Sequence, residues 1–268
     1  PLLGGIAYLG WERRLGELRR FGSAPALLLS VGPGLLWLAG AAGLAEREAL
    51  VIDLEALAAL KPDLVLGWPS GNSPAALERV RRLGYRVVEL EPRRLADVGD
   101  QIEAIGRLAG TEREARQAAG AWRDGLAALQ ARYAGSRPGR VFYQVAPQPL
   151  ITVSREHFIG EAIELCGGEN IYAVVPGLTA VVSVESVVAA APDAIVANDY
   201  TRGPGSPVSG SPLDAWRSWG SLAAVARQRL YVLDPDLMSV PGPRLLKGIT
   251  QLCAALNGTP TAPGVVSR

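Results

Sequence analysis

The sequence predicts an α/β fold of two related lobes joined by a long helix. Three observations predict it: helical patterns alternate with short apolar runs from residue 51 onward, one helix–strand motif occurs twice, and a long helical stretch lies between its two copies. Such alternation is typical of parallel sheets covered by helices. We therefore divide the chain into an atypical segment 1–50, a first lobe 51–94, a connecting helix 95–134 and a second lobe 135–268.

The first 50 residues differ from the rest of the chain. They contain no Asp, Asn, Thr, Gln or Lys, and the stretch from Phe21 to Ala45 carries no charge. Arginines precede this apolar run and small residues follow it, which is the order found in a secretory signal. Because Gly32, Pro33 and Gly34 interrupt the run, a buried helix or a pair of strands is the alternative.

The first lobe begins with a helix that Asp53 can cap and that continues to Leu60. A Pro-Asp turn then leads into residues 64–68, a short apolar run typical of a buried parallel strand. A second helix is expected at about residues 74–83, and the run 85–90 has the pattern of the next strand.

The connecting stretch has two parts. The first covers residues 95–108, and the second starts at Thr111, with Glu114 at the spacing of a capping box. Apolar residues recur along the second part at helical spacing, giving roughly 35 Å of helix. They are Ala115, Ala118, Ala119, Trp122, Leu126, Leu129 and Tyr133.

The second lobe resumes the alternation of strands and helices. Strand patterns cover residues 141–145, 194–199 and 230–234, and helical patterns cover residues 158–165 and 243–256. Several strands separated by helices predict a second parallel sheet, so this lobe is expected to have the same architecture as the first.

A repeated motif relates the two lobes. DLEALAALKPDLVLGW (53–68) and SVESVVAAAPDAIVAND (183–199) place a glutamate, Glu55 or Glu185, at the same distance before a Pro-Asp pair and an apolar strand. Each glutamate follows a capping residue, Asp53 or Ser183, and lies in a first turn, where the helix dipole favours negative charge. Each carboxylate either complements this dipole or is presented to a partner.

Composition excludes several functions. The chain has 27 basic and 26 acidic residues and a formal charge of +1, so it lacks the positive field that nucleic-acid binding requires. One histidine and two cysteines are too few for a typical zinc site, and we expect no metal. The two cysteines are either two buried thiols or one long-range disulfide, and composition does not choose between them.

Residues 51–256 resemble the periplasmic vitamin B12-binding proteins of bacterial ABC importers. The stretches that carry the resemblance are DLEALAALKPDLVLGW, RVFYQV, PLIT, ELCGGENIY, SVESVVAAAPDAIV and PGPRLLKGITQLCAAL.

This resemblance implies a class III periplasmic binding protein fold, with two Rossmann-like lobes bridged by a long α-helix. It further implies a periplasmic monomer, not an enzyme, that captures cobalamin in the inter-lobe cleft. An ABC permease dimer with its ATPase would receive this ligand. An iron-siderophore or haem-binding protein of the same class is the alternative.

The resemblance also assigns roles to four residues outside the cleft. Family members place one cysteine before Gly-Gly-Glu-Asn and another in the last helix, which implies a disulfide between Cys166 and Cys253. Their matching glutamates form salt bridges to permease arginines, one lobe to each permease subunit. Glu55 and Glu185 are therefore expected to dock the protein on its permease.

Five residues are expected at the ligand. Trp68 follows the first-lobe strand at its carboxyl end, where α/β sheets place ligands, and it matches a family pocket tryptophan. Asp236 matches an aspartate that hydrogen-bonds the corrin edge, and Ile151 stands where known members have an aromatic residue. Of Trp216 and Trp219, one is expected to face the cleft, with core packing as the alternative for each.

Two departures from the family affect these expectations. Val240 replaces an arginine that follows the pocket aspartate, which argues mildly against an anionic siderophore. The opening strand of the family and its ligand-contacting tyrosine have no counterpart in residues 1–50. One hypothesis is that this segment is mistranslated. If it is instead the native sequence, the first lobe is expected to be incomplete and to lack its first strand.

A hydrolase is the remaining alternative. It would need His157, the single histidine, but no Gly-Xaa-Ser-Xaa-Gly motif occurs. His157 lies at an apparent helix start, which favours a surface or capping role, and no phosphate-binding loop is present. We therefore expect no catalytic residue, and the ATPase of the importer would be another chain.

Overall fold

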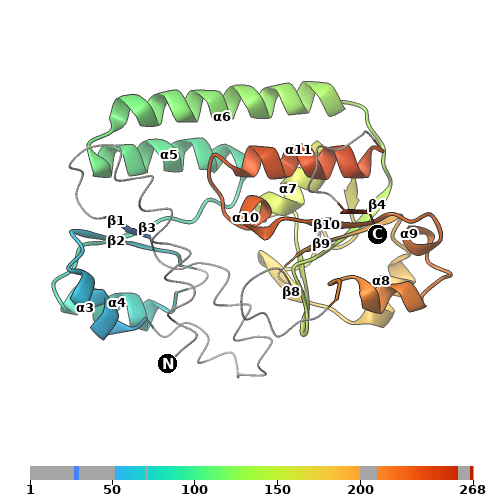
Figure 1. The fold of residues 1–268 in the computed structure, drawn as a ribbon, viewed down its shortest axis with the longest axis horizontal. Coiled ribbons are helices and arrows are strands. Elements are labelled where there is room, and N and C mark those ends of the chain that lie inside the picture. The colour runs from blue at the N-terminus through green and yellow to red at the C-terminus, as the bar shows by residue number, and fades with distance from the viewer. Residues whose placement is uncertain (1–26, 30–51, 70–71, 200–209, 259–265, 268) are drawn as a thin grey trace.

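A computed structural model describes residues 27–29, 52–69, 72–199, 210–258 and 266–267. Two lobes lie beneath a pair of long helices (Figure 1). We call residues 27–29 and 52–94 the N-lobe, and we call the described residues from 135 to 267 the C-lobe. Within the described ranges, no helix is both long and apolar enough to cross a membrane.

The N-lobe contains a three-stranded parallel sheet of β1 (Leu27–Leu29), β2 (Leu64–Gly67) and β3 (Val87–Glu89), in that order. The expectation that this lobe lacks a first strand is wrong, because the backbone of β1 pairs with β2. The remainder of segment 1–50 lies outside the described residues, and so do its signal-like and mistranslated interpretations.

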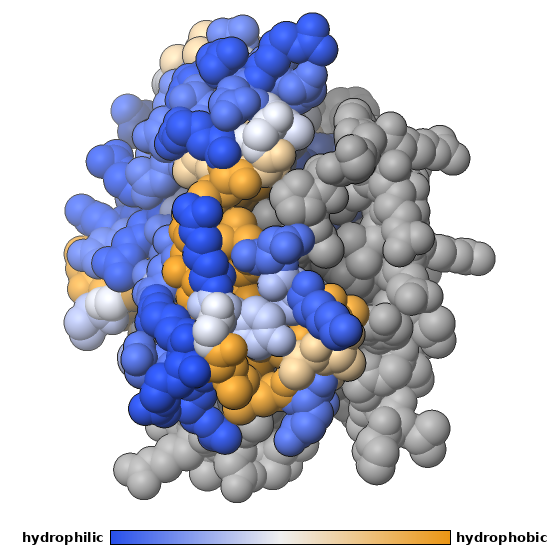
Figure 2. All heavy atoms as spheres, turned by 90° about the vertical axis from the view of Figure 1, so that its left-hand side faces the viewer, coloured by the Kyte–Doolittle hydropathy of each residue, from blue (hydrophilic) through white to orange (hydrophobic). Residues whose placement is uncertain are grey.

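Two helices, α3 (Leu54–Leu60) and α4 (Pro74–Arg82), pack below this sheet (Figure 1). The side chain of Ser73 caps α4 and Pro74 occupies its first turn, a combination that favours helix initiation. Figure 2 shows the molecule from the side on which α3 and α4 lie, and apolar side chains are gathered there among polar ones. Leu60 and Leu83 are large apolar residues that remain exposed in this lobe.

The repeated motif forms the same structure in both lobes. Helices α3 and α8 (Val184–Ala190) each have 7 residues. Their caps are those predicted, since Asp53 and Ser183 each accept a hydrogen bond from the backbone N–H three residues later. Both helices end on a left-handed residue, with φ of 46° at Lys61 and 47° at Ala191.

The connecting stretch is a helical hairpin. Helices α5 (Leu95–Ala109) and α6 (Glu112–Tyr133) lie against each other, and only α6 extends over both lobes (Figure 1). Gly110 ends α5 with a φ of 68°, a conformation that glycine adopts without strain. The chain therefore crosses between the lobes along α6, within a connecting stretch that folds back on itself.

The predicted capping box at the start of α6 does not form. Thr111 is the N-cap residue but makes no side-chain capping bond. The carboxylate of Glu114 instead accepts a hydrogen bond from the guanidinium of Arg113 at 2.9 Å, which holds the pKa of Glu114 below its usual value. The capping-box spacing considers only Thr111 and Glu114, and it does not indicate that Arg113 binds the Glu114 carboxylate.

The C-lobe contains two sheets. The larger has the order β11-β10-β9-β4-β7, in which β10, β9, β4 and β7 are parallel and β11 is antiparallel to β10. Its strands are β4 (Arg140–Gln144), β7 (Glu169–Asn170), β9 (Ala194–Asn198), β10 (Leu230–Leu233) and β11 (Val266–Ser267). The smaller is an antiparallel sheet of β5 (Ala146–Pro147), β6 (Leu150–Val153) and β8 (Thr179–Val181).

The remaining helices of the C-lobe cover its larger sheet and connect its strands. They are α7 (Phe158–Leu165), η3 (Asp214–Ser218), α9 (Ala223–Ala226), α10 (Pro235–Met238) and α11 (Leu245–Leu256). The main hydrophobic core lies between α6, α7, α11 and this sheet, and it includes Trp122, Tyr143 and Ile249. Because α6 contributes Trp122 to that core, the hairpin is fixed firmly to the C-lobe.

The structure contains the disulfide that the family resemblance implies. Cys166, at the end of α7, is bonded to Cys253 in α11, with 4.7 Å between their Cα atoms. Both cysteines are fully buried in the main core. The bond therefore joins the two helices that cover one face of the C-lobe sheet.

Candidate functional site

The carboxyl end of β2 carries Trp68 in a tightly bonded loop. The backbone N–H of Trp68 donates to Oδ1 of Asn72, and the backbone N–H of Asn72 donates to the Trp68 carbonyl, both at 2.7 Å. Asn72 is buried, whereas Trp68 is only half-buried. These bonds fix the backbone of Trp68 while its indole keeps surface for a ligand.

The matching edge of the C-lobe carries Asp236. Its backbone N–H donates to Oδ1 of Asp234 at 2.8 Å, which starts α10 immediately after β10 and leaves Asp236 exposed. At the end of β9, Asn198 accepts a hydrogen bond from the hydroxyl of Tyr143 at 2.6 Å and donates to Oγ of Ser239 at 3.0 Å. This buried chain of hydrogen bonds ties the turn around Asp236 to the sheet.

Ile151 lies in a row across the small antiparallel sheet. It pairs with Ala146 on β5 and with Val181 on β8, so the three side chains share one face. Ile151 is half-buried and Val181 is 64% exposed. Strand β8, which carries Val181, lies on the side of the C-lobe nearest the N-lobe (Figure 1).

The two tryptophans of the second lobe have different environments. Trp216 is 2% exposed, its indole N–H donates to Oε1 of Gln144 at 2.7 Å, and its ring packs edge-on against Phe142. It is thus a core residue, as the alternative interpretation holds. Trp219 is half-buried and only borders that core, so it retains surface.

The repeated glutamates are exposed in the first turns of their helices. Glu55 follows Asp53, and Glu185 follows Ser183. Hydrogen bonds from its own backbone N–H and from Ser183 hold the pKa of Glu185 below its usual value. Helices α3 and α8 lie on the side of the molecule opposite α6, one in each lobe (Figure 1). The two helices that carry these exposed glutamates therefore lie on the same side of the protein.

His157 has a structural role. It caps α7, where its Nδ1 accepts a hydrogen bond from the backbone N–H of Ile159 at 3.1 Å. Burial lowers the pKa of His157 to about 4, so the imidazole is neutral at physiological pH. Within the part of the chain that the structure describes, no group of three or more His, Cys, Asp or Glu side chains could hold a metal ion.

This histidine is expected to make folding sensitive to acid. Because the pKa of His157 is lower in the folded protein than in the unfolded chain, the unfolded chain binds more protons as the pH falls from about 6.5 toward 4. The free energy of unfolding should fall by about 2 kcal/mol from this group between pH 7 and pH 5. Chemical denaturation at both pH values measures it. His157→Asn keeps a capping side chain without this titration, and an unchanged pH dependence in that variant would contradict the assignment.

Comparison with known families identifies the fold. Residues 48–237 match the model of the "Periplasmic binding protein" family, and this range covers most of the chain. The chain belongs to this family. Family members are periplasmic transport proteins that bind a substrate for an importer.

Two relatives in this family are vitamin B12-binding proteins. The protein from Vibrio cholerae is 32% identical over 206 residues, which are 76% of this chain and 72% of the relative. The protein from Yersinia pestis is 29% identical over 259 residues and covers 87% of both chains.

Solved structures of periplasmic binding proteins show the same fold. The periplasmic vitamin B12-binding protein of Vibrio cholerae matches with a TM-score of 0.68 and 30% identity, covering 87% of this chain and 96% of that structure. A periplasmic haem-binding protein from Pseudomonas aeruginosa matches with a TM-score of 0.69 but only 22% identity, covering 90% and 97%. The expected class III fold is thereby confirmed.

Sequence reasoning missed the polar residues behind the ligand edge. Gln144 and Asn198 are each 2% exposed and end neighbouring parallel strands, where they bond Trp216 and Tyr143 respectively. A polar residue at the end of an apolar strand is a usable signal, because burying it requires a partner. Both residues hold in place segments on which candidate ligand residues lie.

Proposed function

We propose that this chain is the substrate-binding component of an ABC importer, that it captures cobalamin between its lobes, and that it delivers the ligand to a permease dimer with its ATPase. It acts as a periplasmic monomer and performs no chemistry on the ligand. The observation that carries this proposal is the 32% identity to a vitamin B12-binding protein over 72% of that protein's length.

Haem binding, the second candidate, has weaker support. The haem-binding structures are 19–22% identical to this chain, a level at which similarity indicates the fold alone. The vitamin B12-binding structure has a comparable TM-score but 30% identity. Sequence, rather than shape, therefore favours cobalamin.

The ligand is held by residues from both lobes. Trp68 supplies aromatic surface from the N-lobe, and Ile151 and Trp219 supply apolar surface from the C-lobe. The exposed carboxylate of Asp236 accepts hydrogen bonds from amides at the corrin edge. Trp216 contributes indirectly, because its buried indole packs the segment that carries Trp219.

A fluorescence titration tests this function. Cyanocobalamin at micromolar concentration should quench tryptophan emission, because Trp68 and Trp219 would lie against the corrin. Haem and ferric hydroxamates should bind at least about tenfold more weakly, because polar groups of the site that are arranged for cobalamin would be left unpaired by these ligands. Trp68→Ala should weaken cobalamin binding by about tenfold, whereas replacement of the core residue Trp122 should act through stability. Absence of cobalamin quenching, or tighter binding of haem, would refute the proposal.

A further inference from the structure

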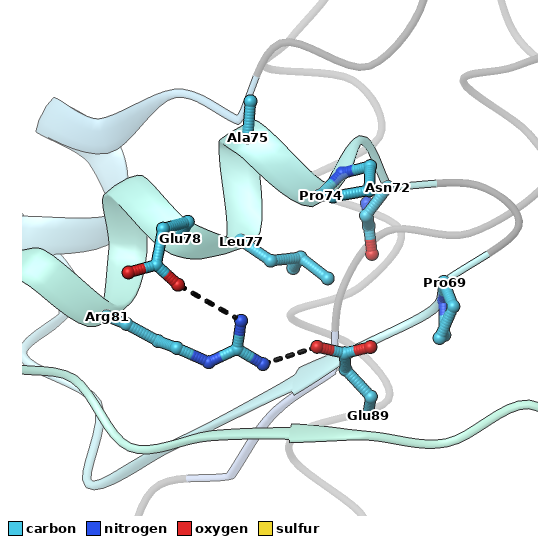
Figure 3. A pocket seen from close by; sticks show the side chains of 8 residues that line it. All are labelled: Pro69, Asn72, Pro74, Ala75, Leu77, Glu78, Arg81 and Glu89. Carbon is cyan, nitrogen blue, oxygen red and sulfur yellow. Dashed lines mark hydrogen bonds and ion pairs between the residues drawn. The ribbon is translucent and has the colours of Figure 1, made fainter.

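A cavity in the N-lobe adjoins the loop that carries Trp68. Its volume is about 420 Å³, within the range of small-ligand sites, and it lies at the carboxyl ends of β2 and β3 (Figure 3). It is lined by Pro69, Asn72, Pro74, Ala75, Leu77, Glu78, Arg81 and Glu89. Ligands of α/β sheets bind at this edge, so the position alone favours a binding role.

One wall of the cavity is an ion-pair network. The guanidinium of Arg81 on α4 bonds Glu89 on β3 and lies 3.5 Å from Oε2 of Glu78. These pairs raise the pKa of Arg81 above its usual value. The bonded oxygen of Glu89 faces Arg81, and its other oxygen points away from Arg81 toward Pro69 (Figure 3). Glu89 therefore keeps an acceptor directed along the cavity.

The opposite wall is apolar and closely packed. Pro69, Pro74 and Leu77 face the charged wall (Figure 3). Gly67, the last residue of β2, lies next to Leu77 and Glu89, because an added Cβ would come within 2.9 Å of Leu77 and 3.6 Å of Glu89. The absence of a side chain at Gly67 thus permits Leu77 and Glu89 to approach the end of β2. The result is a site with one apolar wall and one charged, hydrogen-bonding wall.

This shape fits a short aliphatic arm that ends in a hydrogen-bond donor. The edge of cobalamin carries neutral amide arms, whose CH₂ groups suit an apolar wall and whose NH₂ groups donate to a carboxylate. An anionic arm would instead be repelled, because the cavity wall carries two carboxylates and one guanidinium. We propose that this cavity binds an amide arm of the corrin and that Glu89 accepts its N–H hydrogen bond. This inference rests on the proposed function.

Equilibrium binding of cyanocobalamin to four purified proteins tests the inference. Relative to the wild-type protein, Glu89→Leu should weaken binding about tenfold or more, because a hydrogen bond to a charged acceptor is lost. Glu89→Gln keeps an acceptor and should weaken it less. The matched control, Glu114→Leu, removes a carboxylate from an exposed pair with Arg113 on α6, outside the cavity lining, and should change affinity less than about twofold.

A modified ligand gives a second measurement. In a cyanocobalamin monocarboxylic acid, one amide arm becomes a carboxylate, and the isomer altered at this arm should bind the wild-type protein more weakly than cyanocobalamin does. Glu89→Gln should reduce that discrimination. Unchanged cyanocobalamin affinity in a folded Glu89→Leu protein, or undiminished discrimination in Glu89→Gln, would overturn the assignment of the cavity. Failure of the wild-type protein to bind cyanocobalamin would instead refute the proposed function.

Discussion

Replacing Cys166 and Cys253 together with alanine is expected to lower the free energy of unfolding by about 4 kcal/mol. The bond closes a loop with a sequence separation of 87, and a loop of this length greatly restricts the unfolded chain. Both cysteines are fully buried. Because alanine has no polar side-chain atom, the double replacement leaves no unpaired polar group in the core. Denaturant unfolding of the oxidised protein and of the variant measures the difference.

Reduction of the wild-type protein provides the control. The reduced protein retains both sulfur atoms, so it separates loss of the covalent link from loss of packing volume. We expect most of the destabilisation to appear on reduction alone, because the link acts mainly on the unfolded chain. Equal stability of the oxidised and reduced proteins would show that the bond does not clamp the C-lobe. Such a bond persists in an oxidising compartment, in keeping with the periplasmic location proposed above.

Local signals in the sequence predicted much of the fold. The helix caps at Asp53 and Ser183 form as expected, and helix α7 has the predicted bounds of residues 158–165. These features depend on neighbours within a few residues, which the sequence displays directly. The repeat also predicted equivalent helices in the two lobes, because the same local pattern must form the same local structure.

Features that depend on distant partners were harder to predict. Spacing alone could not show that α5 folds back on α6, since both halves have the same helical pattern. The burial of Trp216 follows from its contacts with Gln144 and Phe142, more than 70 residues earlier in the sequence. The candidate at Glu89 was missed because a single exposed glutamate has no distinguishing pattern until Arg81 and Leu77 are placed beside it.

Replacing Glu55 and Glu185 together with glutamine is expected to abolish delivery of the ligand to the permease while leaving its binding intact. Both carboxylates are exposed in the first turns of α3 and α8, one in each lobe, and these helices lie on the side of the molecule opposite α6 (Figure 1). If each carboxylate bonds an arginine of the permease, loss of both should reduce uptake by at least about tenfold. Uptake of labelled cobalamin into liposomes that contain the importer measures this effect.

The size of any stability change distinguishes docking from a purely structural role. A glutamate in a first helical turn stabilises the helix by only about 0.3–1 kcal/mol, so the double variant should unfold nearly as the wild-type protein does. Glu112→Gln with Glu114→Gln makes the same charge change in the first turn of α6, away from the proposed docking side, and should preserve uptake. Added salt should weaken docking of the wild-type protein, because exposed charges are screened. If the α6 variant lost uptake equally, net charge rather than these two positions would govern delivery, and the docking assignment would fail.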